Sequence, residues 1–541
     1  MGLTPIGSDC FIKEWLVRKD EELRGIQQNL ILSKSTKQSK MLMLRYCFSQ
    51  KVNYLCRTVN PEFMTSFLQN FDRMKLEVVA SIAECEEEGF APFQSIQCLM
   101  HLRDGGLGLH LSHRSKESAY VASVVVCLPG LCELFPHFRE GLRKDWLQQQ
   151  SSEDVDETFM AWHESFKDDE GLFVDDDANP FLVCFVNSIF RVAQSYQESA
   201  SLPPIYEILI RGVNPDKLQS RLFKPVRKLI YQELLSAATL NKDKHRIRSA
   251  RGHGDDAGAW LEVGPRNWHS TIKCADFKVA LRYRLGFDFP ELVRSTQVHK
   301  DNAHHQCPFK KCGEHFDDDA HHFMEDCKCG GRTRTHNAIR DELVVMIRDA
   351  HIAVRKEVNF KGIKEKDGTL VGYRADILMM NGSQDEIIEV SLTNPCCASN
   401  IVSPMEVEDH NAGIKESRQS AEKREYAKLK KYRENGCTKK VIPFIVEVFG
   451  RIGPAGIAFI NKIASQSHDW KYATSKFRSF WLGRISCALV RSLGSSYRQA
   501  LDLYLGTCSE GEIHKSYNLH EQFSEINFMR KGGGGRGKLE D

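Results

Sequence analysis

No uninterrupted apolar run in this chain is long enough to cross a bilayer as a helix. The longest run, Ala119–Cys132, is interrupted by Pro129-Gly130 and is shorter than the roughly 20 residues that a transmembrane helix needs. The N-terminal residues lack the pattern of a secretory signal peptide, and Met1-Gly2 lacks the later Ser or Thr of a myristoylation motif. We therefore expect a nuclear or cytoplasmic protein that is not secreted and has no membrane partner.

The sequence also lacks a disulfide framework and a strong net charge. Its 18 cysteines are scattered, which favours an intracellular, reducing compartment. With 74 Lys and Arg against 72 Asp and Glu, the net charge is +2, so any basic surface for nucleic acid must be local. There is no internal repeat, and 541 residues with 41% hydrophobic side chains allow three or four domains with real cores.

Helical apolar spacing dominates the first 300 residues. Glu22–Leu32 and Pro61–Glu84 show it clearly, and Asp104–Leu109 is a Gly-rich turn in which backbones approach closely. Residues 151–180 are acidic and polar, as in a linker or an exposed loop. We therefore predict a mainly α N-terminal half, with a helical region at 1–150, an acidic linker at 151–180 and a helical, basic domain at 181–300.

The 181–300 domain carries a belt of basic residues. A charge run is usually a solvated face, but two neighbours favour phosphate binding: the Gly-rich Ser249–Pro265 segment and the aromatic, arginine-bearing helix Phe277–Leu285. We expect nucleic-acid contacts from Arg246, Arg248, Arg251, Arg282 and Arg284. The belt consists of Arg211, Lys217, Arg221, Lys224, Arg227, Lys228, Lys242, Lys244, Arg246, Arg248 and Arg251.

The strongest single chemical signal is Cys307-x4-Cys312-x9-His322-x4-Cys327. Three thiols and one imidazole at short spacing fit a tetrahedral structural zinc site. A short polar segment has little core, so bound Zn²⁺ would supply folding energy to a small zinc domain at 301–330. His321 and Cys329 are rival ligands, and free cysteines in a loop are the simpler alternative.

Two apolar runs after residue 370 are each interrupted by an acid. Asp376 lies near the start of Ala375–Met380, and Glu389 lies in the middle of Glu386–Leu392. Asn381-Gly382 between the runs predicts a two-residue turn, hence an antiparallel hairpin across which the two acids can meet. Because an acid in an apolar strand is costly unless it is paired or metal-bound, we expect a site for a hard cation such as Mg²⁺.

The segments around this hairpin predict an αβββαβ order. Asn337–Ala350 has helical spacing, Ile352–Phe360 alternates like a strand and contains Glu357, and a turn follows at Lys366–Gly368. After the hairpin come a charged helix, Asn411–Asn435, and an apolar strand, Val441–Phe449.

With Asp on the second strand and Glu on the third, residues 331–465 resemble the restriction-like endonuclease core of the PD-(D/E)XK type. The resemblance rests on Asp376-x12-Glu389 and on the order of elements. Ala375 stands where that family usually has proline, and Ser391 stands where it usually has lysine. The family's lysine often migrates to the following helix, near a Lys-x-x-Lys-Tyr pattern, and Lys428-Leu-Lys430-Lys431-Tyr432 matches it.

Over most of residues 40–500, the motif order resembles the C-terminal part of a non-LTR retrotransposon polyprotein. In that family a reverse transcriptase is followed by a helical thumb and linker, a CCHC zinc knuckle and a restriction-like endonuclease. The thumb-like region would be 1–150, and 466–541 would be a helical extension with a Gly/Arg-rich tail. The matching segments are Gly105–Gly108, Ala119–Ser123, Ala257–Leu261, Leu281–Gly286, the four knuckle residues, Gly330–Arg332, His336 and Arg374–Ile377.

The polymerase itself is missing from this pattern. Phe173-Val174-Asp175-Asp176 mimics a reverse transcriptase motif, but its flanks are acidic and polar where apolar strands are required. Gly254-Asp255-Asp256 lies in a Gly-rich loop. We therefore expect a fragment or remnant without the reverse transcriptase palm, which does not extend primers.

The resemblance implies a metal-dependent endonuclease that nicks DNA, with RNA as a possible second partner. Asp376 and Glu389 would bind Mg²⁺, with the Val390 carbonyl as a further ligand. Lys428, or alternatively Lys423 or Lys431, would orient the attacking water. Additional candidates for the site are Glu357, Lys431 and Tyr432, and Lys423 and Arg424 would contact the phosphate backbone. Two alternatives remain: an inactive nucleic-acid-binding protein that keeps the nuclease scaffold, and a helical interaction protein in which zinc only stabilises the fold.

Overall fold

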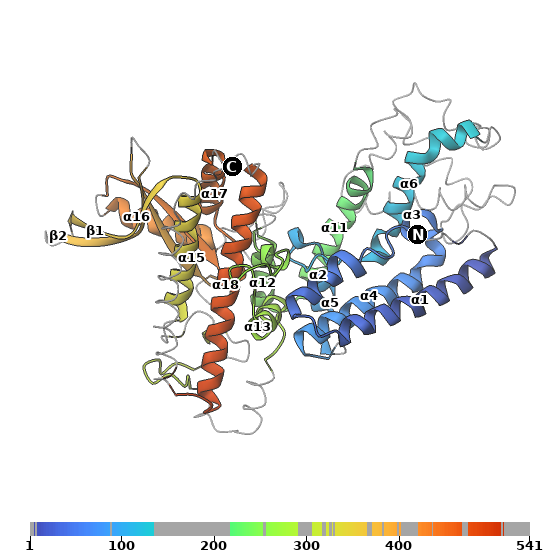
Figure 1. Ribbon diagram of the computed structural model, residues 1–541, viewed down its shortest axis with the longest axis horizontal. Coiled ribbons are helices and arrows are strands. Elements are labelled where there is room, and N and C mark those ends of the chain that lie inside the picture. The colour runs from blue at the N-terminus through green and yellow to red at the C-terminus, as the bar shows by residue number, and fades with distance from the viewer. Residues whose placement is uncertain are drawn as a thin grey trace, which may run out of the picture. The chain divides into compact units, whose positions relative to one another are not determined.

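The computed structural model describes most of the helical and sheet segments of the chain (Figure 1). The described residues are 5, 8–86, 89–134, 217–252, 256–289, 306–315, 321–323, 327, 331–364, 370–380, 384–397, 400–401, 420–434, 437–467, 474–509 and 512, with side chains described except at 128–134 and 361–373. They divide into two compact units, Met1–Gly264 and Pro265–Asp541, and we describe each by itself.

The first unit is built from helices, as the sequence predicts for this half of the chain. The long helices α1 and α4 pack against each other, and α6 packs against α3, α4 and α11. Asn60 caps α4 by accepting a hydrogen bond from Glu62, and Pro61 follows at the first helical position, which needs no donor. The elements are α1 (Asp9–Leu32), α2 (Lys37–Met43), η1 (Leu44–Phe48), α3 (Leu55–Thr58), α4 (Pro61–Ala83), α5 (Pro92–Leu99), η3 (Leu102–Asp104), α6 (Ser112–Leu134), α11 (Leu218–Ala237), α12 (Asn241–Arg251) and η4 (Ala259–Leu261).

A buried polar cluster joins α4 to the start of α6. The Asp72 carboxylate accepts hydrogen bonds from the backbone N–H groups of Ser112 and His113, and Lys75 Nζ lies 2.6 Å from Asp72 Oδ1. Burial alone would raise the pKa of Asp72, but the charge of Lys75 and the hydrogen bond with His113 outweigh it and lower that pKa to about 2. Asp72 therefore acts as the anionic cap of α6 and not as a surface acid.

The predicted Gly-rich turn lies just before α6. Gly105 and Gly108 have φ values of 88° and 77°, and a Cβ on Gly106 would collide with the carbonyl oxygen of Met100. The glycines are therefore needed for a tight turn and close backbone approach, as the sequence indicates.

The second unit contains a four-stranded mixed sheet with strand order β1-β2-β3-β4. β1 pairs with β2 and β2 with β3 in antiparallel register, whereas β3 and β4 are parallel. The succession from α15 to β4 is helix, three strands, helix and strand, as predicted. The elements are α13 (Cys274–Leu285), α15 (Gly331–Asp349), β1 (Ala353–Lys364), β2 (Leu370–Met380), β3 (Glu386–Thr393), α16 (Ser420–Glu434), β4 (Lys440–Glu447), α17 (Pro454–Gln466) and α18 (Thr474–Tyr504).

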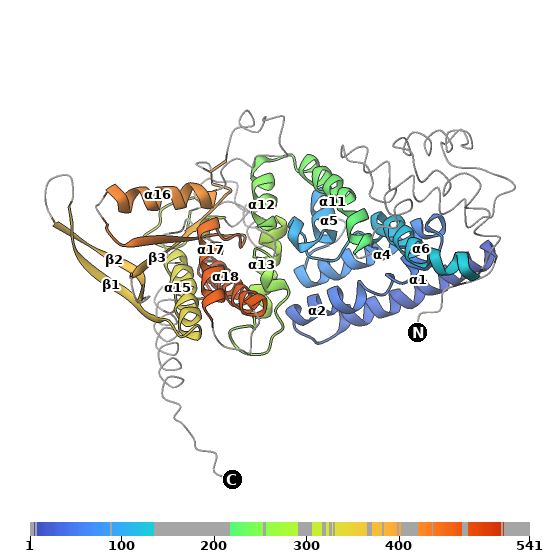
Figure 2. The ribbon, with the colours of Figure 1, turned by 90° about the horizontal axis from the view of Figure 1, so that it is seen from above.

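Helices cover both faces of this sheet. Figure 2 shows α16 above the strands and α15 and α17 below them, and β3, buried along its whole length, lies in the centre. The paired strands β1 and β2 extend beyond β3 as an arm, because β3 pairs with β2 only from Ile377 to Met379.

The 31-residue helix α18 holds the second unit together. It packs against both α15 and α13, and Asp276 of α13 pairs with Arg498 of α18 at 2.7 Å. A Cβ on Gly494 would lie 2.8 Å from the Asp276 Cα, so the two helices approach closely at this glycine. The expected 181–300 domain is thus divided: α11 and α12 belong to the first unit and α13 to the second. Among the described helices, none combines the length and apolar character needed to span a membrane.

Candidate metal centre and candidate acidic site

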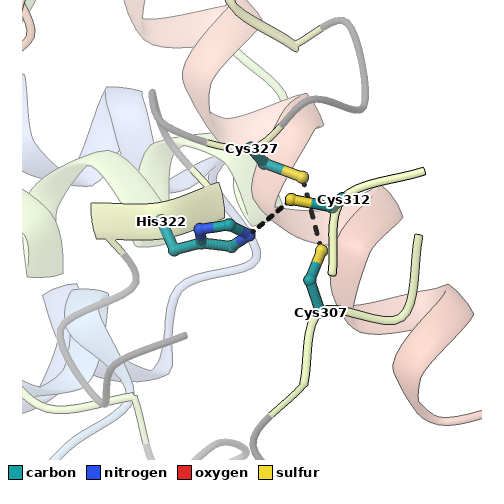
Figure 3. A group of neighbouring side chains, drawn as sticks. All are labelled: Cys307, Cys312, His322 and Cys327. Atoms are coloured by element: carbon teal, nitrogen blue, oxygen red, sulfur yellow. Dashed lines mark hydrogen bonds between the residues drawn. The ribbon is translucent and has the colours of Figure 1, made fainter. Parts of the chain in front are cut away.

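Cys307, Cys312, His322 and Cys327 converge on one point (Figure 3). Their donor atoms all lie within 4.8 Å of one another, with 3.4 Å between the Cys307 and Cys327 sulfurs and 3.5 Å between Cys312 Sγ and His322 Nε2. Zn–S bonds of about 2.3 Å in a tetrahedron give sulfur–sulfur edges of roughly 3.8 Å, which fall within this range. The donor set therefore fits a structural zinc ion.

The backbone around the cluster bends to bring the four ligands together. Cys307 N–H donates to the Glu314 carbonyl at 2.8 Å, Gln306 and His315 form an isolated antiparallel bridge, and Gly313 turns the chain with a φ of 67°. The contacts of Cys307 with Cys327 and His322 lower the pKa of the Cys307 thiol, which favours the thiolate that binds metal. Since all four ligand residues are buried, the site is closed to solvent.

The neighbouring His321, a rival ligand in the sequence, has a different role. Its Nδ1 lies 2.8 Å from the hydroxyl of Tyr283, and the Tyr283 ring stacks on Phe449 with 4.6 Å between centroids. This contact packs the segment of the four Cys and His residues against α13 and the segment after β4. The other rival, Cys329, lies outside the described residues.

Asp376 and Glu389 meet where the ladder between β2 and β3 ends. The last backbone pair is Ile377↔Ile388, so Asp376 and Glu389 are the next two residues in register. Beyond this pair, carboxylates take over as acceptors: Val390 N–H donates to Asp376 Oδ2 at 2.9 Å, and Asp376 N–H donates to Glu389 Oε1 at 3.4 Å. The strands thus bring the two predicted acids together at the edge of the sheet core.

The electrostatics of this pair favour a cation. Glu389 is 4% exposed, and its burial and the nearby charge of Asp376 raise the pKa of Glu389 against the opposing effects of Lys428 and Tyr432. Oδ1 of Asp376 has no hydrogen-bond partner within the described part of the chain. Two close acids with one unused oxygen form a donor set that fits a hard divalent cation.

Helix α16 supplies the positively charged side chain that β3 lacks. Lys428 Nζ lies 3.2 Å from Glu389 Oε2, and Tyr432, one turn later, also hydrogen-bonds Glu389. Ser391, at the position where a lysine was expected, is buried and accepts a hydrogen bond from Arg424 Nε at 3.3 Å. Lys423 and Lys431 are exposed, so among the three candidate lysines Lys428 is the one that reaches the acids.

Two anchors fix α16 against the sheet and α17. Arg451, 1% exposed, binds Glu422 at 2.6 Å and Glu447 at 3.1 Å. Glu425 accepts a hydrogen bond from the Ala455 backbone at the start of α17, and burial raises the pKa of Glu425 to about 7. These contacts lie on the helix turns before Lys428 and therefore hold its backbone in place.

His336 is a site residue whose role the sequence does not reveal. Its Nε2 lies 3.1 Å from Asp376 Oδ2, from helix α15. Burial lowers the pKa of His336, but the hydrogen bond to Asp376 and its charge outweigh that effect and raise it. The sequence pattern alone could not predict this contact, because it joins a helix to a strand. His336 was singled out only because it lies in one of the segments that resemble the retrotransposon family.

Glu357, a further candidate for the metal shell, is engaged elsewhere. It pairs with Arg340 at 2.5 Å and, more closely, with Arg374. Those arginines lower the pKa of Glu357 against the effect of burial. Its φ of 56° interrupts the β1–β2 ladder between the pairs of Lys356 and Val358. In this structure Glu357 is therefore part of an arginine network beside the site.

Three of the five arginines between 246 and 284 that were expected to contact nucleic acid are buried. Arg246 is 3% exposed and hydrogen-bonds Gln97 at 2.9 Å, and Arg282 donates to the Asp288 carbonyl at 2.8 Å. Arg284 is 2% exposed. The prediction is corrected for these three, because a guanidinium enclosed by protein is not a surface for phosphate.

The other two basic candidates are half-buried. Arg251 packs over the Tyr231 ring with 4.7 Å to its centroid, and Arg248 lies on the same helix, α12. Arg211 of the expected basic belt lies outside the described residues. Asp175, Asp176 and Asp255 of the polymerase-like motifs also lie outside them. Asp256 is 1% exposed and packs beside Gly252.

Comparison with known proteins does not identify a family for this chain. No protein-family model matches the chain, and no curated protein matches it. The function must therefore be argued from the two sites themselves.

Proposed function

We propose that this chain is a metal-dependent endonuclease that hydrolyses DNA phosphodiesters, with a restriction-like core in the second unit. The observation that carries the proposal is the meeting of Asp376, Glu389 and Lys428 from β2, β3 and α16. Two adjacent strand acids and one cation match the residue types that the PD-(D/E)XK resemblance implies. The same resemblance supports a relationship to the nuclease end of non-LTR retrotransposon proteins, without the polymerase palm.

The carboxylates of Asp376 and Glu389 would hold Mg²⁺. The bound ion would lower the pKa of a water molecule and neutralise charge on the phosphate. Asp376 offers Oδ1, since its Oδ2 already accepts from His336 and Val390. Glu389 is presented by the buried strand β3, so both carboxylates are held on rigid elements.

Lys428 would orient the attacking water and stabilise charge on the phosphate. The Lys428 side chain is 23% exposed and its Nζ lies beside Glu389, so it can face both the acid and an incoming phosphate. Exposed Lys423 and Arg424 on the same helix would contact the DNA backbone. The zinc knuckle would stabilise the fold next to this core.

The decisive experiment is nicking of supercoiled DNA with Mg²⁺. Asp376→Ala and Glu389→Ala should each reduce nicking on the order of a hundredfold or more, whereas Glu434→Ala, an exposed acid of α16, should leave it unchanged. The double variant should lose little more than either single one, because the two acids act as a unit. DNA binding, measured with Ca²⁺, should persist in all variants.

Two results would contradict the proposal. Wild-type protein that binds DNA but never nicks it with any divalent metal would exclude the enzyme. Single acid variants that nick as fast as wild type would show that the reaction occurs elsewhere.

One observation favours a second function, an inactive nucleic-acid-binding protein. Helix α16 carries exposed Lys423, Lys430 and Lys431, and such a track binds phosphate without any catalysis. In that case binding would survive every acid substitution and weaken steeply with salt, while nicking would be absent from the wild type.

A further inference from the structure

A surface of the second unit that the proposed nuclease does not use carries exposed aromatic side chains. Trp268 is 57% exposed and Phe480, on α18, is 46% exposed. Large rings at such exposure are unusual when the same unit buries Trp481 and Phe477 to 1% each. What distinguishes these two rings is that each lies beside an arginine on the same surface.

Each of the two exposed rings lies beside an arginine. Trp268 lies over the Arg491 guanidinium at 5.2 Å, and its own backbone carbonyl accepts a hydrogen bond from Arg491. Arg484 lies 5.8 Å from the Phe480 centroid and 4.6 Å from that of Trp481. Positions 480, 484 and 491 fall on one face of α18, and the rise from 480 to 491 is roughly 16 Å. The result is a strip with a ring near each end.

His269 fixes the middle of the strip. Its Nδ1 lies 2.7 Å from Arg484 Nη2 and 3.1 Å from Glu342 Oε1. The segment that carries Trp268 is thereby held along α18, and the two exposed rings keep a defined spacing. A platform for planar groups has to be rigid in this way before its ligand arrives.

The charge of the strip is positive. Arg484 and Arg491 share one carboxylate, Glu342, at 2.7 Å and 4.0 Å, so one positive charge is left in excess. Along α18 the only acid is Asp502; its cations are Lys476, Arg478, Arg484, Arg491 and Arg498. A ligand that suits this surface has planar apolar faces and negative charge.

We propose that the strip of Trp268, Phe480, Arg484 and Arg491 binds single-stranded nucleic acid, whose bases stack on the exposed rings. Unpaired bases provide flat faces, and their phosphates provide the negative charge that α18 complements. Ring stacking with arginine nearby is the usual way in which proteins hold single strands without reading their sequence. Duplex DNA hides its base faces and gains nothing from the rings. The inference does not depend on the proposed cleavage, since it concerns binding by other residues.

The test is fluorescence anisotropy of labelled oligo-dT and oligo-rU with the full chain, without added Mg²⁺ and without a chelator that would remove zinc. Trp268→Ala and Phe480→Ala should each weaken binding about tenfold. Tyr54→Ala removes a ring of the first unit that is 52% exposed, and should change nothing. Trp268→Phe should restore most of the affinity. The ratio of the two dissociation constants, for oligo-dT and oligo-rU, tells whether the surface prefers single-stranded DNA or RNA.

Three results would overturn the inference. Wild-type protein that binds neither oligonucleotide would exclude it, and so would ring variants that bind like wild type. An equal loss for duplex DNA, in ring variants whose unfolding temperature matches that of the wild type, would show a general electrostatic surface in place of base stacking. Asp376→Ala should bind the single strand normally, so a failure of the nuclease proposal leaves this test intact.

Discussion

The Nε2 atom of His336 on α15 lies 3.1 Å from Oδ2 of Asp376 on β2, across 40 residues of sequence. The same oxygen accepts from the Val390 backbone on β3. Asp376 is therefore oriented by a helix and a neighbouring strand at once, which leaves its other oxygen free to face a cation. Groups that hold a metal-binding carboxylate in this way change metal affinity when they are removed.

From this contact we predict that His336→Asn will raise the Mg²⁺ concentration needed for half-maximal nicking about tenfold. A Mg²⁺ titration of the nicking rate measures it. His351→Asn is the matched control, because His351 is an exposed histidine just beyond the end of the same helix. An unchanged Mg²⁺ requirement for His336→Asn would show that Asp376 does not need this bond.

Lys428 and Lys431 should differ in their effects on cleavage. Lys428→Ala removes the only lysine whose contact with Glu389 the structure describes, and we expect the nicking rate to fall about a hundredfold. Lys431 is exposed, so Lys431→Ala should lower DNA affinity slightly and leave the rate at saturation nearly unchanged. Single-turnover rates at saturating protein measure both. Equal losses in the two variants would contradict the assigned role of Lys428.

The thiol cluster predicts about one zinc ion per chain in purified protein. Cys312→Ser should lower the zinc content measured by atomic emission. It should also lower the unfolding temperature of the second unit. The segment of the four ligands contacts the rest of the unit through His321, which lies against Tyr283, and Tyr283 stacks on Phe449. Cys508→Ser, a thiol outside the cluster, is the control. If protein prepared in reducing buffer contains no bound zinc, the assignment of the site is wrong.

Asp72 makes the first unit sensitive to acid. The pKa of Asp72 falls from 3.8 to about 2 on folding, so its stabilisation is complete above pH 4 and is lost as the pH drops toward 2. The difference corresponds to about 2 kcal/mol. Hydrogen exchange of the α4 and α6 amides at pH 6 and pH 3 measures the part that is lost by pH 3, about 1 kcal/mol, with Glu21→Gln as an exposed control. In Asp72→Asn the unit should be weaker at pH 6 and should lose less between the two pH values.

The sequence predicted the acids and their lysine for identifiable reasons. The two apolar runs and the turn signal between them predicted that Asp376 and Glu389 could meet across a hairpin, and the backbone register brings them together. The predicted two-residue turn, Asn381-Gly382, lies outside the described residues, but β2 ends at Met380 and β3 begins at Glu386, so the connection is longer than two residues. Lys428 was named because the Lys-x-x-Lys-Tyr pattern resembles the place of the family's migrated lysine, and its Nζ lies 3.2 Å from Glu389 Oε2. The four zinc ligands were found because three cysteines and one histidine lie within a short segment. Whether the site cleaves DNA stays a prediction.

Other features had no local signal. The buried arginines Arg246, Arg282 and Arg284 look like surface charges in the sequence, because charge alone does not reveal whether protein encloses a side chain. The assignment of α13 to the second unit depends on its packing with α18, about 200 positions later. Such long-range contacts have no period in the sequence.

The position of α18 has a consequence for how the second unit is made. Both α13 and α15 pack on this helix, which is the last helix of the second unit that the structure describes. During synthesis α15 leaves the ribosome long before α18, the helix that packs on it, has been made. The surface of α15 that packs on α18 therefore stays exposed until α18 has been added. A shortened chain that stops after α17 would keep every proposed catalytic residue and still be prone to aggregation.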